Sequence, residues 1–247
     1  MLQALSGVLV YLIIPVVATV IGGVGAALRQ PGQRTQSFFQ HFAAGVVFAA
    51  VAGELLPEIT RERAPLQVVI GFALGVIVML GIRQLTETPG QLEENKPEQP
   101  TGLVITVGID LLVDGLLVGV GFAAGAQNGI LLTVALTIEI LFLALSAASS
   151  LVEAGTSRGR VIVISVVFAL IVAIGAGIGV TLLSGLSGPT LELVLSFGAA
   201  ALLYLVTEEL LVEAHNVPET PLLAAAFFLG FLVLFIIEIV ALPAGGA

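Results

Sequence analysis

Eight long apolar stretches constrain the fold of this 247-residue chain more than any other feature of its sequence. A helix needs about 20 mostly apolar residues to cross the hydrocarbon core of a bilayer. Each stretch is continuously apolar, without the in/out alternation of a membrane β-barrel strand. We therefore predict an all-α polytopic membrane protein with eight transmembrane helices. The stretches are 4–28, 38–57, 66–82, 103–126, 130–151, 161–183, 190–212 and 222–242.

The composition supports a membrane protein and excludes several other classes. Hydrophobic residues make up 58% of the chain and charged residues only 10%, whereas soluble domains carry about 25% charged residues. A soluble enzyme and a disordered chain are both excluded by this scarcity of charge. The net charge of −9 also argues against nucleic acid as a partner. The chain has no cysteine, which excludes disulfides and thiolate metal sites.

The basic residues predict how the helices are oriented in the membrane. Six of the eight lie on one side, and only Arg61 and Arg63 lie on the other. Because cytoplasmic loops are enriched in Lys and Arg, the six-residue side is expected to be cytoplasmic, with both termini outside, in a multi-pass protein of the inner or plasma membrane. The stretch 83–100 is rich in Pro, Glu and Gln and is expected to be a flexible linker there, with a regulatory or metal-gathering loop as the alternative. The six are Arg29, Arg34, Arg83, Lys96, Arg158 and Arg160.

An internal repeat relates the two ends of the chain at an offset of 155 residues. The segment 42–58, FAAGVVFAAVAGELLPE, aligns with 197–213, FGAAALLYLVTEELLVE, and 71–80 aligns with 226–235. This offset moves each helix five spans along, an odd number, so the second copy is inverted in the bilayer. The predicted layout is three helices (4–82), a central two-helix hairpin (103–151) and three inverted helices (161–242). Inverted repeats are typical of secondary transporters, whose substrate site lies near the midplane.

Three acidic residues, Asp110, Asp114 and Glu139, lie within the central hairpin, and no predicted span has an interior Lys or Arg. An ionised carboxylate at the bilayer centre costs at least about 2.5–3.5 kcal/mol. Asp110 and Asp114 share one helix face, one turn apart. Asp114 and Glu139 are nearly equidistant from the hairpin turn at 127–128, so both are expected at mid-depth. The pattern predicts a buried cation site, with protonated packing residues as the alternative.

The repeat also relates acids near two helix ends, and a histidine lies beside each of two helix ends. We expect the acids to line the points where an ion enters and leaves, or else to be solvated. The histidines are either secondary ligands or ordinary interfacial residues. These residues are Glu54, Glu58, Glu209, Glu213, His41 and His215.

Several of these segments resemble the ZIP family of divalent metal transporters. The segments 41–58 (HFAAGVVFAAVAGELLPE) and 202–215 (LLYLVTEELLVEAH) are similar to its second and seventh helices, especially in the prokaryotic GufA-like branch. The stretch DLLVDG (110–115) is similar to the fourth-helix motif His-Asn-x-x-Glu-Gly. In this alignment Asp110 stands for the histidine, Leu111 for the asparagine and Asp114 for the glutamate. The resemblance implies a homodimer in which a unit containing the central hairpin moves against a scaffold containing the second and seventh helices.

The chain departs from the family pattern in ways that affect the expected site. The stretch TIEILFLAL (137–145) retains only Glu139 of the fifth-helix motif, and the sixth span has no acid. We therefore expect at most one carboxylate-rich site in place of a two-metal centre. Oxygen ligands suit Mg²⁺, Ca²⁺ or Mn²⁺, while Zn²⁺ also binds carboxylates and Fe²⁺ stays open. The metal is expected as the substrate, with no separate cofactor.

The resemblance implies a carrier that moves a divalent cation toward the cytoplasm through Asp110, Asp114 and Glu139. The alternative is a divergent homologue that exchanges protons or another cation, or acts as a non-transporting sensor. The short motifs Gly185-Leu186-Ser187-Gly188 and Glu208-Glu209 raise a third class, an intramembrane protease. No later helix supplies an interior histidine, so we expect no enzymatic activity. The expected partners are the bilayer, the metal ion and a second copy of the chain.

Overall fold

Eight helical segments in the computed structural model are long and apolar enough to cross a membrane, as predicted. The structure describes residues 2–61, 63–86, 100–183 and 185–241, and every regular element in these ranges is helical. Most of the 83–100 linker, including Lys96, lies outside the described residues. The eight segments are Val10–Leu28, Gln33–Ile59, Pro65–Gln84, Thr101–Ala123, Ala126–Glu153, Arg158–Leu183, Gly188–Ala214 and Pro221–Val240.

Several helices extend beyond the apolar stretches from which they were predicted. The second begins at Gln33 rather than 38, and the sixth begins at Arg158 rather than 161. Hydropathy marks the hydrocarbon core, whereas backbone hydrogen bonding continues a helix into the polar interface. The long helices are α1 (Leu2–Leu28), α2 (Gln33–Ala50), α4 (Pro65–Thr86), α5 (Pro100–Ala123), α6 (Ala126–Glu153), α7 (Arg158–Leu183), α8 (Gly188–Tyr204) and α10 (Pro221–Ala241).

Two of the spans contain a π-helical turn that the sequence pattern did not predict. The second span runs from α2 through the π turn η1 (Val51–Leu55) into α3 (Leu56–Ile59). The seventh runs from α8 through η2 (Leu205–Leu210) into α9 (Leu211–Ala214). The two π turns coincide at the 155-residue offset, and π turns in helices occur frequently at functional sites. Pro57 removes a backbone donor next to η1, but η2 forms with Val212 at the equivalent position, so the proline is not required.

Helix packing follows the inverted repeat. α4 packs against α8, and the equivalent helix α10 packs against α2. A Cβ atom on Gly75 would lie 2.6 Å from the carbonyl oxygen of Phe197, and one on Gly230 would lie 2.0 Å from that of Phe42. Gly75 with Gly230, and Phe42 with Phe197, are equivalent pairs in the repeat, so both copies make the same close helix contact. The same relation extends to the hairpin, because α5 packs against α7 and α6 packs against α1.

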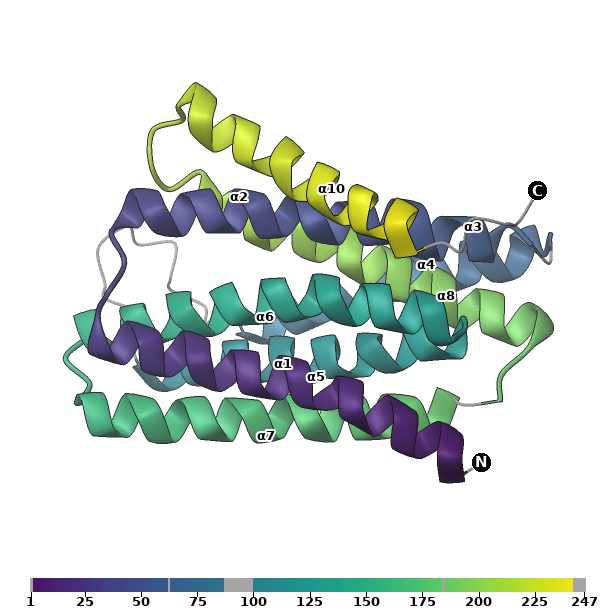
Figure 1. Cartoon of the computed structure of the whole chain (residues 1–247), viewed down its shortest axis with the longest axis horizontal. Coiled ribbons are helices and arrows are strands. Elements are labelled where there is room, and N and C mark those ends of the chain that lie inside the picture. Colours follow the sequence, from purple (N-terminus) through teal and green to yellow (C-terminus); the bar gives the residue numbers. More distant parts are fainter. Residues whose placement is uncertain (1, 62, 87–99, 184, 242–247) are drawn as a thin grey trace.

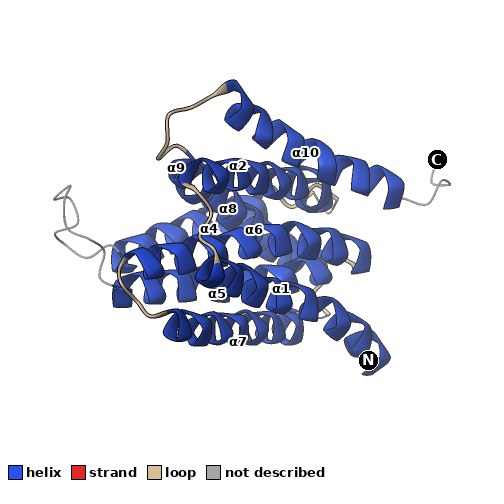
Figure 2. Cartoon of the chain, turned by 60° about the vertical axis from the view of Figure 1, so that its left-hand side comes forward, coloured by secondary structure: helices blue, strands red, loops and turns tan. Residues whose placement is uncertain are grey.

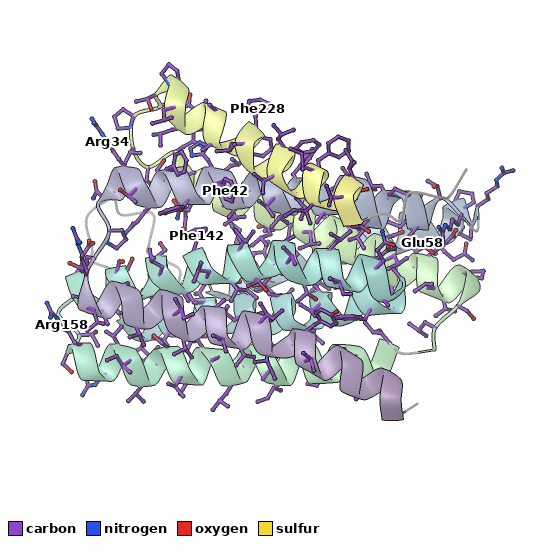
Figure 3. All side chains as sticks on the ribbon, in the orientation of Figure 1. Arg34, Phe42, Glu58, Phe142, Arg158 and Phe228 are labelled. Carbon is purple, nitrogen blue, oxygen red and sulfur yellow. The ribbon has the colours of Figure 1, made fainter. Side chains whose placement is uncertain are left out.

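The helices form two groups of four, seen in Figures 1 and 2 with α10 and α7 on opposite sides of the bundle. The α5–α6 group contains α1, α5, α6 and α7, and the α2–α8 group contains α2, α4, α8 and α10 with their short extensions. Arg34 and Arg158 lie at one end, opposite Glu58 (Figure 3). We call this the basic end. Arg83, in the last turn of α4, belongs to it too. α1 begins and α10 ends at the other end (Figure 1).

The surface of the bundle is apolar, as a bilayer requires. Phe228 of α10 projects outward with 71% of its surface exposed (Figure 3). Large aliphatic side chains are likewise exposed along α4, α7 and α10. Between the helices, side chains such as Leu111, Leu136 and Phe168 are almost fully buried. Since lipid and core are both apolar, hydrophobicity alone does not specify the packing, and close helix contacts at small residues contribute to it.

Candidate functional site

A polar cavity of about 650 Å³ lies between the two helix groups. It extends from residues at the basic end, such as Gln33 and Asn216, into the bundle as far as Asp110 and Glu139. From Gly102 to Asp110 along α5 is about 12 Å, close to half the thickness of a hydrocarbon core. The cavity therefore connects the basic end with carboxyl groups deep in the bundle.

Glu139 lines the inner limit of this cavity, and Asp114 lies beside it, so that the two residues face each other across α5 and α6. Their carboxyl groups interact with each other, and their side chains are 2% and 0% exposed. Neither oxygen of Glu139, nor Oδ2 of Asp114, has a hydrogen-bond partner among the described residues. Asp110 lies one turn nearer the basic end, half-buried on the cavity wall. A buried carboxyl pair without a donor is costly and requires a proton, water or a cation.

Glu209 and Glu213, from the seventh span, add two more carboxyl groups to the cavity wall. Glu209 interacts electrostatically with Asp110, Asp114 and Glu139. Glu213 interacts with Asp110 and accepts a hydrogen bond from the Gln40 side chain. Five carboxyl groups from both helix groups thus form one electrostatic network.

One basic side chain reaches the rim of this network. Arg83 Nη1 lies 3.1 Å from Glu208 Oε2, and both side chains are about half exposed. Arg83 also interacts with Glu209. In the sequence, Arg83 indicates only the orientation of the protein. Its role at the rim was missed because the helix α4 continues past the apolar stretch, to Thr86.

Small residues place the fourth span close to the sixth. A Cβ atom on Gly115 would lie 2.5 Å from the carbonyl oxygen of Val172, and one on Gly175 would lie 2.4 Å from that of Leu112. The backbones of α5 and α7 therefore approach one another as only glycine permits. This contact holds α5 against α7 at Gly115, the residue next to Asp114. The acidic face of α5 is thereby turned toward α6 and α8.

The other two acids predicted from the repeat, Glu54 and Glu58, lie away from the carboxyl cavity. Glu54, on the π turn η1, is buried and interacts electrostatically with Glu238 of α10. Glu58 forms an ion pair of 2.9 Å with Arg61 at the exposed end of the same span. Neither Glu54 nor Glu58 lines the cavity described above. Glu238 was missed in the sequence, although the 155-residue offset makes it the equivalent of Arg83.

The two histidines lie together at the basic end, outside the carboxyl cavity. Among the described residues, His41, His215 and Glu219 are the one group of three ligand-type side chains whose ligand atoms lie within 4.8 Å of one another. The carboxyl oxygens of Asp110, Asp114 and Glu139 do not form so tight a group in this conformation. A hydrogen bond with the Leu211 carbonyl raises the pKa of His215, and Glu219 raises it further. Glu219 was missed because it lies in a short loop without any motif.

Two further residues lie apart from the carboxyl cavity. Glu192 is 1% exposed and its Oε2 accepts a hydrogen bond of 3.1 Å from the backbone N–H of Ala64, where the chain enters α4. Ser187, from the protease-like motif, is the N-cap residue of α8. It lies at the end of the bundle opposite His41 and His215, so neither histidine is available to activate it.

The fold and the cavity together define a polytopic helical membrane protein with carboxyl groups at its centre, an architecture suited to cation transport. The family model described as ZIP zinc transporter matches residues 99–238, more than half of the chain. The chain therefore belongs to the ZIP family of metal transporters, as the sequence motifs suggested. A comparison with curated proteins finds no match. The matched range begins before α5 and leaves the first three spans to be related to it through the internal repeat.

Proposed function

We propose that this protein carries a divalent metal cation toward the cytoplasm through a site formed by Asp110, Asp114 and Glu139. The observation that carries the proposal is the buried, facing pair of Asp114 and Glu139, of which Glu139 lines the inner limit of a polar cavity. Neither oxygen of Glu139, nor Oδ2 of Asp114, has a hydrogen-bond donor among the described residues. A bound divalent cation neutralises such a pair, whereas the empty pair is electrostatically unfavourable. Glu209 and Glu213 line the route between the site and the basic end.

The direction of transport is inferred from the positive charge at the ends of the helices. If the basic end faces the cytoplasm, as the distribution of Lys and Arg favours, the cavity is an inward-facing vestibule. Both termini then lie outside, in the inner or plasma membrane. Glu54 and Glu238 lie near the opposite end of the second and eighth spans, and their paired carboxyl groups are suited to attract a cation entering from outside.

The ligand chemistry of the proposed site favours hard cations. The described residues offer carboxylate oxygens there, and both histidines of the chain lie elsewhere. Oxygen donors suit Mn²⁺, Ca²⁺ and Mg²⁺, while imidazole is favoured by Zn²⁺ and other transition metals. We therefore propose that the preference for Zn²⁺ over Mn²⁺ is weak. The absence of histidine from the site also supports a divergent position within the family.

The division into two helix groups suggests how the site changes its accessibility. Asp110, Asp114 and Glu139 all belong to the α5–α6 group, whereas Glu209 and Glu213 belong to the α2–α8 group. We propose that the α5–α6 group moves against the α2–α8 group, which serves as the scaffold of a homodimer. The three carboxyl groups come closer together when a cation is bound than they are in the conformation described here.

The experiment that tests this function is saturable uptake of Mn²⁺ and Zn²⁺ into proteoliposomes. Uptake is expected to fall to the background of empty liposomes in Asp114→Asn. Glu192→Gln is the matched control, because it also removes a buried carboxylate but leaves an oxygen to accept the Ala64 hydrogen bond. Unchanged uptake in Asp114→Asn, or equal loss in Glu192→Gln, would contradict the proposed site.

The second candidate is a homologue that no longer carries transition metals and exchanges protons or another cation, or acts as a sensor. It is favoured by the absence of both histidines from the lining of the central cavity, and by ligand atoms of the three acids that do not all lie within 4.8 Å of one another. Titrating Zn²⁺, Mn²⁺, Ca²⁺ and Mg²⁺ while measuring the melting temperature separates the candidates, because a ligand that binds the folded state raises this temperature. The titration uses the variant His215→Ala, so that binding at the two histidines does not mask the result. If neither Zn²⁺ nor Mn²⁺ raises the melting temperature of this variant, the second candidate is favoured.

A further inference from the structure

His41, His215 and Glu219 form a second cluster of metal-ligand type, separate from the central carboxyl groups. His41 lies in the first half of α2, and His215 and Glu219 lie at and beyond the end of α9. The imidazole ring centroids are 5.2 Å apart, and one ligand atom from each of the three side chains lies within 4.8 Å of the other two. Residues from two distant parts of the chain are thus brought together at the basic end.

Hydrogen bonds orient both imidazole rings in the manner of metal ligands. His41 Nδ1 lies 2.8 Å from the carbonyl oxygen of Ser37, and His215 Nδ1 is hydrogen-bonded to that of Leu211. A carbonyl oxygen only accepts, so each Nδ1 carries the proton and each neutral ring has its lone pair on Nε2. Histidines that bind metals commonly donate their other N–H to such a carbonyl, which fixes the tautomer.

An ion pair at the surface explains only part of this cluster. His215 Nε2 lies 2.6 Å from Glu219 Oε1, and a protonated His215 would satisfy that contact alone. His41 is different, because the residue is 3% exposed and its Nε2 has no hydrogen-bond partner within the described ranges. A buried acceptor without a partner is destabilising. A metal ion shared with His215 and Glu219 would supply the missing interaction.

The surrounding contacts hold the cluster in place. Ser37 Oγ donates a hydrogen bond of 2.7 Å to the carbonyl oxygen of Ala214, directly before His215. One residue before His41, the Gln40 side chain donates to Glu213. These bonds fasten α2 to α9, so the two histidines are prearranged. Ser37, Gln40 and Glu213 line the carboxyl cavity, but the histidines do not.

We propose that His41 Nε2, His215 Nε2 and the Glu219 carboxylate bind a divalent transition metal ion such as Zn²⁺, independently of the proposed transport site. Two imidazoles and one carboxylate, with water as the fourth ligand, are a ligand set that Zn²⁺ adopts in tetrahedral sites. The ion would join α2 to the α9–α10 loop within the scaffold group. This inference goes beyond the proposed function, and its ligand chemistry differs from that of the central carboxyl groups.

The composition of the chain makes the test direct, because His41 and His215 are its only histidines. Protein labelled with ¹³Cε1-histidine and purified without a histidine tag gives two imidazole signals in NMR spectra. Addition of Zn²⁺ is expected to shift both signals together and to saturate at one equivalent. Mg²⁺, which binds imidazole poorly, is expected to leave them unchanged. If Zn²⁺ shifts neither signal, or shifts that of His215 alone, the site is contradicted.

Substitutions of the exposed ligands distinguish metal binding from a structural role. His215→Ala and Glu219→Gln alter side chains that are about half exposed, so the protein is expected to fold. In each variant, the Zn²⁺ concentration that produces half of the shift of the His41 signal is expected to rise at least about tenfold. Asp114→Asn is expected to leave this shift unchanged, which separates the result from that of the transport site. An unaltered His41 response in Glu219→Gln and His215→Ala would overturn the proposal.

Discussion

Asp114 and Glu139 face one another across the central hairpin, and both side chains are buried. In the part of the chain that the structure describes, neither oxygen of Glu139 nor Oδ2 of Asp114 has a hydrogen-bond donor. This relationship predicts opposite effects of substitution with and without metal. Asp114→Asn removes a like-charged group, so it is expected to stabilise the metal-free protein by about 1–3 kcal/mol. The same change is expected to abolish the rise in melting temperature that Mn²⁺ produces in the wild type.

Both effects are measured by thermal unfolding in detergent, with Glu139→Gln as a second single variant and with the double variant. Because the two carboxylates are expected to bind the same ion, the loss of metal-induced stabilisation is expected to be non-additive. Additive losses would show that the two residues act at separate sites.

Gly75 and Gly230 provide a test of the inverted repeat in the fold. A Cβ atom would collide with the carbonyl oxygen of Phe197 in the first case and of Phe42 in the second. Gly75→Ala and Gly230→Ala are each expected to destabilise the protein by about 1–3 kcal/mol. Gly81→Ala, in the same helix as Gly75, meets open space and is the matched control. The melting temperature of the control is expected to be higher than that of either variant. Equal melting temperatures of all three proteins would contradict the close helix contacts at Gly75 and Gly230.

The pair of Arg83 and Glu208 at the cavity rim predicts a kinetic effect more than a structural one. The ion pair is about half exposed, and such pairs contribute only about 0–1 kcal/mol to stability. Arg83→Gln makes the cavity more negative and so attracts divalent cations that enter it from the basic end. The KM for cation transport measured in that direction is therefore expected to fall. Arg61→Gln, which removes the equivalent kind of pair at the other end, should leave this KM unchanged. A raised KM in Arg83→Gln would refute the electrostatic role.

The proposed orientation is testable because the chain has no native cysteine. Ser150 lines the cavity, and Thr60 is exposed at the opposite end of the bundle. Ser150→Cys is expected to react with a membrane-impermeant thiol reagent only from the cytoplasmic side, and Thr60→Cys only from outside. The measurement is labelling of intact cells against inverted membrane vesicles. The reverse pattern would place the basic end outside and reverse the proposed direction of transport.

The number of spans and the family could be predicted from the sequence because both depend on local patterns. Apolar runs mark the hydrocarbon core, and the repeat was visible as coincident residues such as Glu54 with Glu209. The mid-depth position of Glu139 is a prediction from helix geometry alone. None of these inferences requires knowledge of a tertiary contact.

The rest depended on tertiary packing, which the linear pattern does not contain. The π turns, which displace Glu54 and Glu209 from a regular helical face, have no clear local signal, as the different residues Pro57 and Val212 illustrate. The proximity of His41 to His215 and Glu219 requires α2 to pack against α9. Arg83 reaches Glu208 only because α4 extends beyond its apolar run. The 155-residue offset could have revealed Glu238 as the equivalent of Arg83.

The location of the carried ion is the most direct test of the proposed transport site. Crystals grown with Mn²⁺ and measured at a wavelength where manganese scatters anomalously would locate the ion without reference to activity. An anomalous peak is expected between the carboxyl groups of Asp114 and Glu139, with Asp110 beside it, and this peak is expected to be lost in Asp114→Asn. Absence of density between these residues in a protein that still transports Mn²⁺ would contradict the proposed transport site.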